Sequence, residues 1–346
     1  MKRESTSPRT ARRQRWALCS ASGSRARQRA ALTSGSLAHV GHVVQRRQEP
    51  RSGRDLHAGR CEEVGQLHPP VTTGVLWHTA RMELEGSRVL VTGASRGIGA
   101  ALAEELAAAG ALVVLLGRDA SALEGVAHRV DGVPLVADLA DPAQVSGLVD
   151  RIEAQEGPID VLVNNAAIDS AGEFVDLEQE QVEALYRVNL LTPVELCRQV
   201  LPGMLERGCG HIVNVSSLAA FSAFPGIAIY GSSKAGLTQF TAGLSADLRG
   251  RPVGTTIVEL GPAATGMMDR VSSHQPTADS FARLHRLRLL AEVPPQSAAR
   301  ATVEAVRAGR RHVRLPRRAA VAAELAAAPR RTTEWLLTGI SHQQKR

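Results

Sequence analysis

The segment RVLVTGASRGIGAALAEELAAA, residues 88–109, constrains the fold of this chain more than any other stretch. It begins with an apolar run typical of a strand buried on both faces. It ends in an alanine- and leucine-rich stretch of high helix propensity, and Gly93, Gly97 and Gly99 lie between the two. A strand that turns through glycines into a helix presents free backbone N–H groups at the positive end of the helix, which favours phosphate binding. The segment therefore predicts a dinucleotide-binding turn, the alternative being a tight turn without a ligand.

Each of the three glycines has its own expected task. Gly93 allows the tight turn, Gly97 lets the backbone approach a pyrophosphate, and Gly99 lets the helix pack closely on the strand. Their spacing is G-x-x-x-G-x-G rather than the commoner G-x-G-x-x-G. The prediction therefore depends on the strand before the glycines and the helix after them.

Strand and helix patterns alternate through residues 82–315. Strands are expected at 88–92, 111–117, 133–137, 160–163, 211–216, 253–260 and 312–315. Helices are expected at 120–130, from 142, across 178–206 with interruptions at Pro193 and Pro202, at 230–248 and at 296–308. This alternation predicts an α/β fold, a Rossmann-type doubly wound parallel sheet in a single three-layer domain. Ligands then bind beyond the carboxyl ends of the strands.

Residues 1–81 differ in composition from the rest of the chain. They hold 15 of the 41 Lys and Arg residues but only 5 of the 34 Asp and Glu, so the net charge of +7 comes from this segment. Three readings stay open: a basic arm for nucleic acid or an acidic surface, an Arg- and Ser-rich targeting segment, or a misassigned start. We favour the third, with translation beginning at Met82, and expect little order before it. The remaining residues are slightly acidic, so no nucleic-acid binding is expected of the domain at 82–315.

Further boundaries come from apolar runs, cysteines and prolines. No run of about 18 apolar residues occurs, so no membrane span is expected. The four cysteines form no C-x-x-C pair, so no metal site is indicated, and a reducing, cytoplasmic location is expected.

Pro276, Pro294 and Pro295 are expected to break the region after Gly261 into irregular helical pieces. The helical tail at 316–346 is expected to pack on the body, the alternatives being another subunit or a membrane surface.

The sequence YGSSK, residues 230–234, places a tyrosine and a lysine four residues apart, on one face of a helix. A phenol with an ordinary pKa near 10 is a poor acid or base at neutral pH. A nearby ammonium favours the phenolate and lowers that pKa, so the pair could exchange a proton near neutrality. The alternative is an unremarkable surface helix.

Two polar residues upstream support the chemical interpretation. Ser217 ends an expected strand, where its hydroxyl could hydrogen-bond a substrate oxygen, unless it is a simple turn serine. Asn189 lies within an expected helix, although asparagine is a mediocre helix former. A functional kink or water site is one interpretation of this asparagine, and an exposed polar residue is the other.

With these motifs in order, the chain resembles the short-chain dehydrogenase/reductase family continuously from Met82 to Met268, and the resemblance is expected to extend to about Leu315. The resemblance rests on TGASRGIG at 92–99, Asp138-Leu139, NNAA at 164–167, Asn189, Ser217 and YGSSK at 230–234. It implies that Asn189, Ser217, Tyr230 and Lys234 are the catalytic residues. It also implies a cofactor site made by Gly93, Ser95, Arg96, Gly97, Ile98, Gly99, Arg118, Asp138, Leu139, Asn165, Ala166, Tyr230, Lys234, Gly261 and Thr265. By the same resemblance, residues 178–206 and 230–248 are expected to pair across subunits in a homodimer or homotetramer.

Two motifs depart from the family pattern. Ala167 stands where the family usually has the glycine of NNAG. Glu259-Leu260-Gly261 replaces the usual N-P-G after the sixth strand, while the glycine and Thr265 are kept. These departures are expected to affect loop shape and substrate preference, and cofactor binding is still expected.

The choice of dinucleotide depends on the end of the second strand. An NAD site places an acid there for the ribose 2′-OH, but this strand ends in Gly117 followed by Arg118. Arg118 and Arg96 could together hold a 2′-phosphate. We therefore expect NADP(H) rather than NAD, the alternative being that Asp119 serves the ribose.

The expected function is NADP(H)-dependent interconversion of a ketone or aldehyde and an alcohol, with Tyr230 as general acid and base. Phenylalanines and methionines at 219–229 and 265–290 suggest an apolar small-molecule substrate. One alternative is a non-catalytic NADP-binding regulatory or scaffold protein, against which the complete set of four polar residues argues. Another is nucleic-acid binding, which would depend entirely on residues 1–81.

Overall fold

The computed structural model describes residues 81–263, 274–287 and 291–316. They belong to the second of the two compact units into which the chain divides. The predicted basic extension, Thr265, and the tail beyond Pro316 lie outside the described residues. The predicted start at Met82 therefore stays a prediction.

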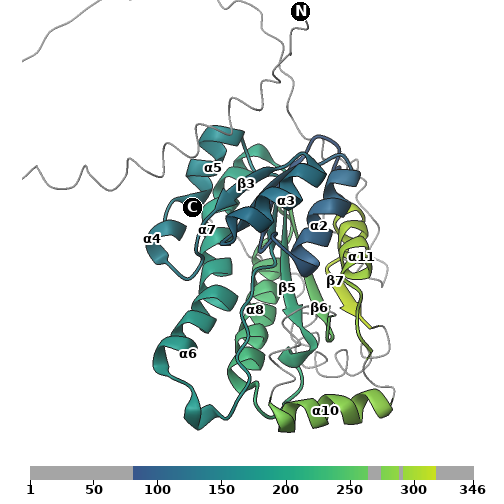
Figure 1. The fold of residues 1–346 in the computed structure, drawn as a ribbon. Helices are drawn as coiled ribbons and strands as arrows, with labels where there is room; N and C mark the ends of the chain where they lie inside the picture. The colour runs from purple at the N-terminus through teal and green to yellow at the C-terminus, as the bar shows by residue number, and fades with distance from the viewer. Residues whose placement is uncertain (1–80, 264–273, 288–290, 317–346) are drawn as a thin grey trace, which may run out of the picture. The chain divides into compact units, whose positions relative to one another are not determined.

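A seven-stranded parallel sheet organises the described residues, as the alternating pattern predicted (Figure 1). The strand order is β3-β2-β1-β4-β5-β6-β7. The order reverses between β1 and β4, and this reversal opens a crevice for a ligand at the carboxyl ends of the strands. The strands are β1 Arg88–Thr92, β2 Leu112–Gly117, β3 Val133–Val136, β4 Val161–Asn164, β5 Gly210–Ser217, β6 Val253–Leu260 and β7 His312–Leu315.

Helices cover both faces of the sheet and make three layers (Figure 1). One face packs against α2 Gly97–Ala108, α3 Ala120–Val130 and α11 Pro295–Arg307. The other packs against α7 Thr192–Arg207 and α8 Ala228–Asp247, with α4 Pro142–Val145 and α5 Leu148–Glu156 beside α7. The Asp141 side chain accepts a hydrogen bond from Ala143 N–H, and Pro142 occupies the first turn of α4, which begins at the predicted residue.

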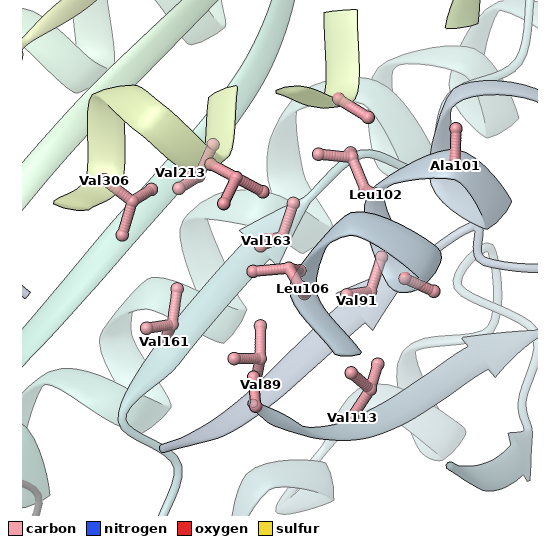
Figure 2. Close-up of a cluster of buried hydrophobic side chains, with 14 of the residues drawn as sticks. Val89, Val91, Ala101, Leu102, Leu106, Val113, Val161, Val163, Val213 and Val306 are labelled. Carbon is pink, nitrogen blue, oxygen red and sulfur yellow. The ribbon is translucent and has the colours of Figure 1, made fainter. Parts of the chain in front are cut away.

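The core explains why the strands read as unbroken apolar runs. Val89 and Val91 of β1 face α2, where they meet Leu102 and Leu106 (Figure 2). The residue between the two valines, Leu90, is equally buried although it points to the opposite face. A strand buried on both faces therefore does not alternate between apolar and polar residues in its sequence.

The stretch 178–206 differs from its prediction. It forms α6 Gln179–Tyr186, a π-helical segment η2 Arg187–Leu191, and α7. Pro202 lies inside α7 and does not interrupt it, whereas the irregularity directly precedes α7 and Pro193. Pro193 has no N–H to donate within the helix. The N–H of the preceding residue, Thr192, bonds the Arg187 carbonyl, five residues back, as in a π-helix. The interruption is therefore a wide turn rather than a break.

The prolines after Gly261 begin helices instead of breaking them. Pro276 lies in the first turn of α10 Gln275–Arg286, and Pro295 is the first residue of α11. Proline suits this position because the first N–H groups of a helix have no partner within the helix. None of the helices in the described ranges is long and apolar enough to cross a membrane.

Candidate active site

The turn between β1 and α2 is joined directly to the end of β4. The Thr92 hydroxyl accepts hydrogen bonds from the N–H groups of Asn165 and Ala166, each at 3.0 Å. The Asn165 side chain in turn donates to the carbonyls of Thr92 at 3.0 Å and Gly93 at 3.3 Å. Three of the predicted cofactor residues, Gly93, Asn165 and Ala166, therefore lie together at the point where the strand order reverses.

Two glycines in this turn are required by their surroundings. Gly93 has a φ of +66°, and a Cβ there would lie 2.8 Å from the Cα of Ala166. A Cβ on Gly99 would overlap with the carbonyl oxygen of Gly93. Both positions therefore exclude any other residue without a backbone shift, as the tasks assigned to them require.

The first turn of α2 presents its backbone N–H groups at the same turn. Arg96 precedes the helix in an extended conformation, and its side chain does not cap the helix. Gly97 and Ile98 begin α2, so the predicted residues Ser95 to Gly99 surround the positive end of this helix. This arrangement fits a pyrophosphate, because an anion there would meet N–H donors and the helix dipole together.

The end of β2 presents an arginine rather than a ribose-binding acid. Arg118 follows Gly117 and is exposed, as is Arg96. Asp119 is the N-cap of α3, and its carboxylate accepts a hydrogen bond of 3.0 Å from Ala122 N–H. The acid that could have served an NAD ribose is therefore engaged in helix capping.

At the end of β3, the predicted Asp138 and Leu139 are fixed by the adjoining turn. The Asp138 carboxylate accepts a hydrogen bond of 2.9 Å from Ala140 N–H. Leu139 is buried, and its carbonyl accepts a 2.8 Å hydrogen bond from the hydroxyl of Thr192. This contact links the expected adenine end of the site to the start of α7.

Tyr230 and Lys234 lie one turn apart in α8. The Lys234 ammonium is 5.9 Å from the centroid of the Tyr230 ring and donates a 2.9 Å hydrogen bond to the Val215 carbonyl on β5. Burial lowers the pKa of this ammonium to about 8. The two side chains therefore share a face and an environment, as the spacing of four predicted.

The phenol differs from expectation in the direction of its pKa. Burial raises the pKa of Tyr230 to about 12, a hydrogen bond from Ser217 acts in the lowering direction, and the charge of Asp169 raises it further. Desolvation therefore outweighs the neighbouring ammonium in this structure. Asp169 was missed from the sequence, although its position two residues after NNAA was a usable signal.

Ser217 reaches Tyr230 because it ends β5. Its one hydroxyl hydrogen can be donated to the phenol oxygen, which lowers the pKa of the phenol, or to the Leu260 carbonyl at 3.3 Å, and its oxygen accepts from Ala219 N–H at 3.1 Å. The serine is therefore both a turn residue and a neighbour of the phenol, so the two sequence interpretations of it are compatible.

Asn189 is buried within the π-helical segment η2. Its side-chain amide bonds both backbone groups of Ile168, donating to the carbonyl at 2.8 Å and accepting from the N–H at 2.9 Å. The amide also donates to Ser233 at 3.2 Å, and Ser233 donates to the Tyr230 carbonyl at 2.7 Å. Asn189 thus connects the loop after β4 to the helix that carries Tyr230, and it is not the exposed polar residue of the alternative reading.

The unusual residues at the end of β6 form a buried ion pair. Glu259 bonds Arg314 of β7, and both side chains are almost fully buried. Arg314 was missed from the sequence because its partner lies 55 residues away, although an arginine in a short apolar strand was a signal. Gly261 N–H bonds the Leu315 carbonyl at 2.7 Å, so β7 supports this edge of the site. No cluster of three or more His, Cys, Asp or Glu in the described part of the chain is suited to a metal ion.

Comparison with known sequences gives a consistent picture. The family model for short chain dehydrogenases matches residues 87–276. The ketoacyl reductase HetN of Nostoc sp. is 36% identical over 230 residues, which cover 65% of this chain and 76% of the relative. The 3-oxoacyl-[acyl-carrier-protein] reductase FabG of Salmonella typhimurium is 31% identical over 215 residues, 62% of this chain and 84% of the relative.

Solved structures are similar over most of the described residues. A short-chain dehydrogenase from Sphingobium yanoikuyae in complex with NADPH has a TM-score of 0.62 at 27% identity, covering 75% of this chain and 98% of that one. A metagenomic short-chain oxidoreductase in complex with NADP has a TM-score of 0.55 at 30% identity, covering 67% and 98%. The match covers nearly the whole of each solved chain, so the similarity extends beyond the nucleotide-binding half of the sheet.

Proposed function

Because this chain belongs to the short-chain dehydrogenase/reductase family, we propose that it is an NADP(H)-dependent reductase and dehydrogenase whose proton donor and acceptor is Tyr230. The family makes it an oxidoreductase that acts on CH–OH groups with a nicotinamide cofactor. The proposal adds the residues, the preferred dinucleotide and the substrate class.

One observation carries the catalytic assignment. The Tyr230 phenol is hydrogen-bonded by Ser217 and lies one helical turn from the Lys234 ammonium. The dinucleotide supplies the hydride. In the reduction, Ser217 orients the carbonyl oxygen, and the Tyr230 phenol gives that oxygen its proton as the hydride adds to carbon. In the oxidation, the phenolate removes the alcohol proton, and the Lys234 ammonium stabilises the phenolate charge.

Asn189 is proposed to hold a water through which protons pass from Lys234 to solvent, as the family resemblance implies. Its amide is engaged with Ile168 and Ser233. Its carbonyl lies four residues before Pro193, which has no N–H to donate to it. The backbone carbonyl of Asn189 is therefore the group we assign to the water.

Arginines at two strand ends support NADP(H) over NAD. Arg96, which directly precedes α2, and Arg118, which follows β2, are exposed, and Asp119 is engaged as a helix cap. Guanidinium groups suit a phosphate because they donate in a planar fork. Two of the similar solved structures hold NADPH or NADP and another holds NAD, so the preference proposed here depends on the arginines.

We propose an apolar ketone or aldehyde as substrate. Phe224, in the segment between β5 and α8, stacks on Phe281 of α10 with centroids 4.9 Å apart, so the chain that leads into the helix of Tyr230 carries aromatic surface. The relatives named ketoacyl reductases agree with a carbonyl on an apolar chain. Met267 and Met268, two of the methionines from which an apolar substrate was predicted, lie outside the described residues. Homo-oligomeric assembly and cytoplasmic location stay predictions.

A panel of ketones, aldehydes and alcohols, followed by NADPH absorbance at fixed enzyme concentration, tests this function. We expect turnover with apolar carbonyl compounds and a lower KM for NADPH than for NADH. A protein that binds NADPH and turns over none of the panel would favour the scaffold alternative.

A further inference from the structure

The last four residues of β5 are each joined to α8 by a polar contact. Asn214 donates to the Thr241 hydroxyl at 2.9 Å, and the Val215 carbonyl accepts from the Lys234 ammonium at 2.9 Å. Ser216 contacts the Lys234 carbonyl at 3.1 Å and the Thr238 hydroxyl at 2.8 Å, and Ser217 bonds the Tyr230 phenol. Four consecutive residues of the strand thus contact α8 between Tyr230 and Thr241, so the strand end fixes the position of the helix along its axis.

Lys234 is held at both of its ends by adjacent residues of the strand. The carbonyl of Val215 receives its ammonium, and the hydroxyl of Ser216 bonds its backbone carbonyl. Lys234, Ser216 and Thr238 are only 2–3% exposed, so water does not compete for these bonds. The position of the ammonium relative to the phenol is therefore set by β5 as well as by α8.

The protons around Ser216 can be placed by elimination. A carbonyl oxygen cannot donate, so the Ser216 hydroxyl donates to Lys234 when both contacts are made. The Thr238 hydroxyl must then donate to the Ser216 oxygen. Thr238 therefore acts through Ser216 rather than bonding the helix carbonyl four residues back, as a threonine in a helix commonly does.

We propose that Ser216 and Thr238 are positioning residues for the proton-transferring pair: their linked hydroxyls hold Lys234 at its working distance from Tyr230. The proposal rests on the proposed roles of Tyr230 and Lys234, and neither Ser216 nor Thr238 needs to touch substrate or cofactor. The charged groups that face the phenol in the described residues are the Lys234 ammonium and the Asp169 carboxylate. If the ammonium were free to move away from the phenol, the Asp169 carboxylate would have the larger effect on the phenol. The phenol would then keep its proton to higher pH.

The experiment compares Thr238→Val, Ser216→Ala and the hydroxyl-retaining Thr238→Ser with a matched control. Thr302→Val removes another buried threonine hydroxyl, one that bonds the carbonyl four residues back in α11, on the opposite face of the sheet. We expect kcat to fall about tenfold in Thr238→Val and Ser216→Ala, less than the ~100-fold that a 1 Å misplacement can cause. KM should change less than kcat. The rising limb of the pH profile of kcat for alcohol oxidation should move to higher pH. Thr238→Ser should recover most of the rate.

The double variant Ser216→Ala/Thr238→Val should fall no further than the worse single variant, because the two hydroxyls act as one unit. An unchanged kcat and pH limb in both single variants, or an equal loss in Thr302→Val, would overturn the proposal. Either of the two single variants suffices if the other does not fold. Tyr230→Phe, assayed alongside, distinguishes failure of the proposed function from failure of the positioning role. If Tyr230→Phe keeps full turnover, the proposed function itself is wrong. If Tyr230→Phe is inactive while Thr238→Val is unaffected, only the positioning role is rejected.

Discussion

The Ser217 hydroxyl, at the end of β5, hydrogen-bonds the phenol of Tyr230, in the first turn of α8. The two residues are brought together because the parallel strand ends at the ligand crevice and the helix that follows packs back along the same strand. A carbonyl oxygen placed between the two hydroxyls would be oriented by the serine and protonated by the tyrosine. This contact places the chemistry at the edge of the sheet that the glycine turn also occupies.

Gly99→Ala should abolish measurable NADPH binding, because the added methyl group meets the Gly93 carbonyl and pushes α2 away from the turn. Fluorescence titration with NADPH measures the effect. Gly125→Ala is the matched control, since it lies in α3 with no atom near the new methyl group. Gly125→Ala should bind normally and unfold at an equal or higher temperature. Equal affinity in Gly99→Ala would show that the close packing of this turn is not needed.

Arg96→Ala/Arg118→Ala should raise KM for NADPH at least about tenfold, since charge-assisted hydrogen bonds contribute about 1.5–3 kcal/mol. KM for NADH should stay close to that of the parent, because NADH has no 2′-phosphate. Steady-state kinetics with both cofactors check this, with Arg307→Ala, an exposed arginine in α11, as control. A parallel loss with both cofactors would assign these arginines to the pyrophosphate instead.

Asp169→Asn should lower the pKa of Tyr230, because the Asp169 charge favours the protonated phenol. The oxidation of alcohol needs the phenolate, so its rate should begin to rise at lower pH than in the parent. The pH profile of kcat measures the shift, and Asp176→Asn, an exposed acid in the same loop, controls for the loss of one charge. A shift to higher pH would show that Asp169 acts on another group.

His211 gives an independent prediction for folding. It is fully buried on β5, contacts the Thr256 hydroxyl at 2.8 Å, and has a pKa lowered to about 4 by burial. Between the ordinary pKa near 6.5 and this value, the unfolded chain binds a proton that the folded chain refuses. The free energy of unfolding should therefore fall by up to about 3 kcal/mol as pH drops through this window. Urea titrations at pH 7, 5.5 and 4 measure it, and a flat profile would contradict the assignment.

Local chemistry made much of the fold predictable. β1, α3, β6 and β7 have the predicted bounds, because burial on both faces leaves unbroken apolar strands and Asp119 marks the start of its helix. The glycines and the four-residue spacing in α8 were also sufficient to name most residues of the candidate site, whose roles stay predictions.

Contacts between distant residues were not predictable in the same way. The pairing of Glu259 with Arg314 depends on two strands meeting, and the raised pKa of Tyr230 depends on burial that no local pattern reports. The π-helical turn at Asn189 comes with a contact to Ile168, 21 residues away in the sequence. Only the assembled sheet brings these groups within reach of one another.

The most direct test of the account is the turnover of Tyr230→Phe, which removes one oxygen atom from the site. We predict that kcat falls by about 10²- to 10⁴-fold in both directions, while the dissociation constant for NADPH, from fluorescence titration of the same protein, changes by less than about threefold. Turnover close to that of the parent would mean that the proton comes from another group, and the catalytic assignment would be wrong.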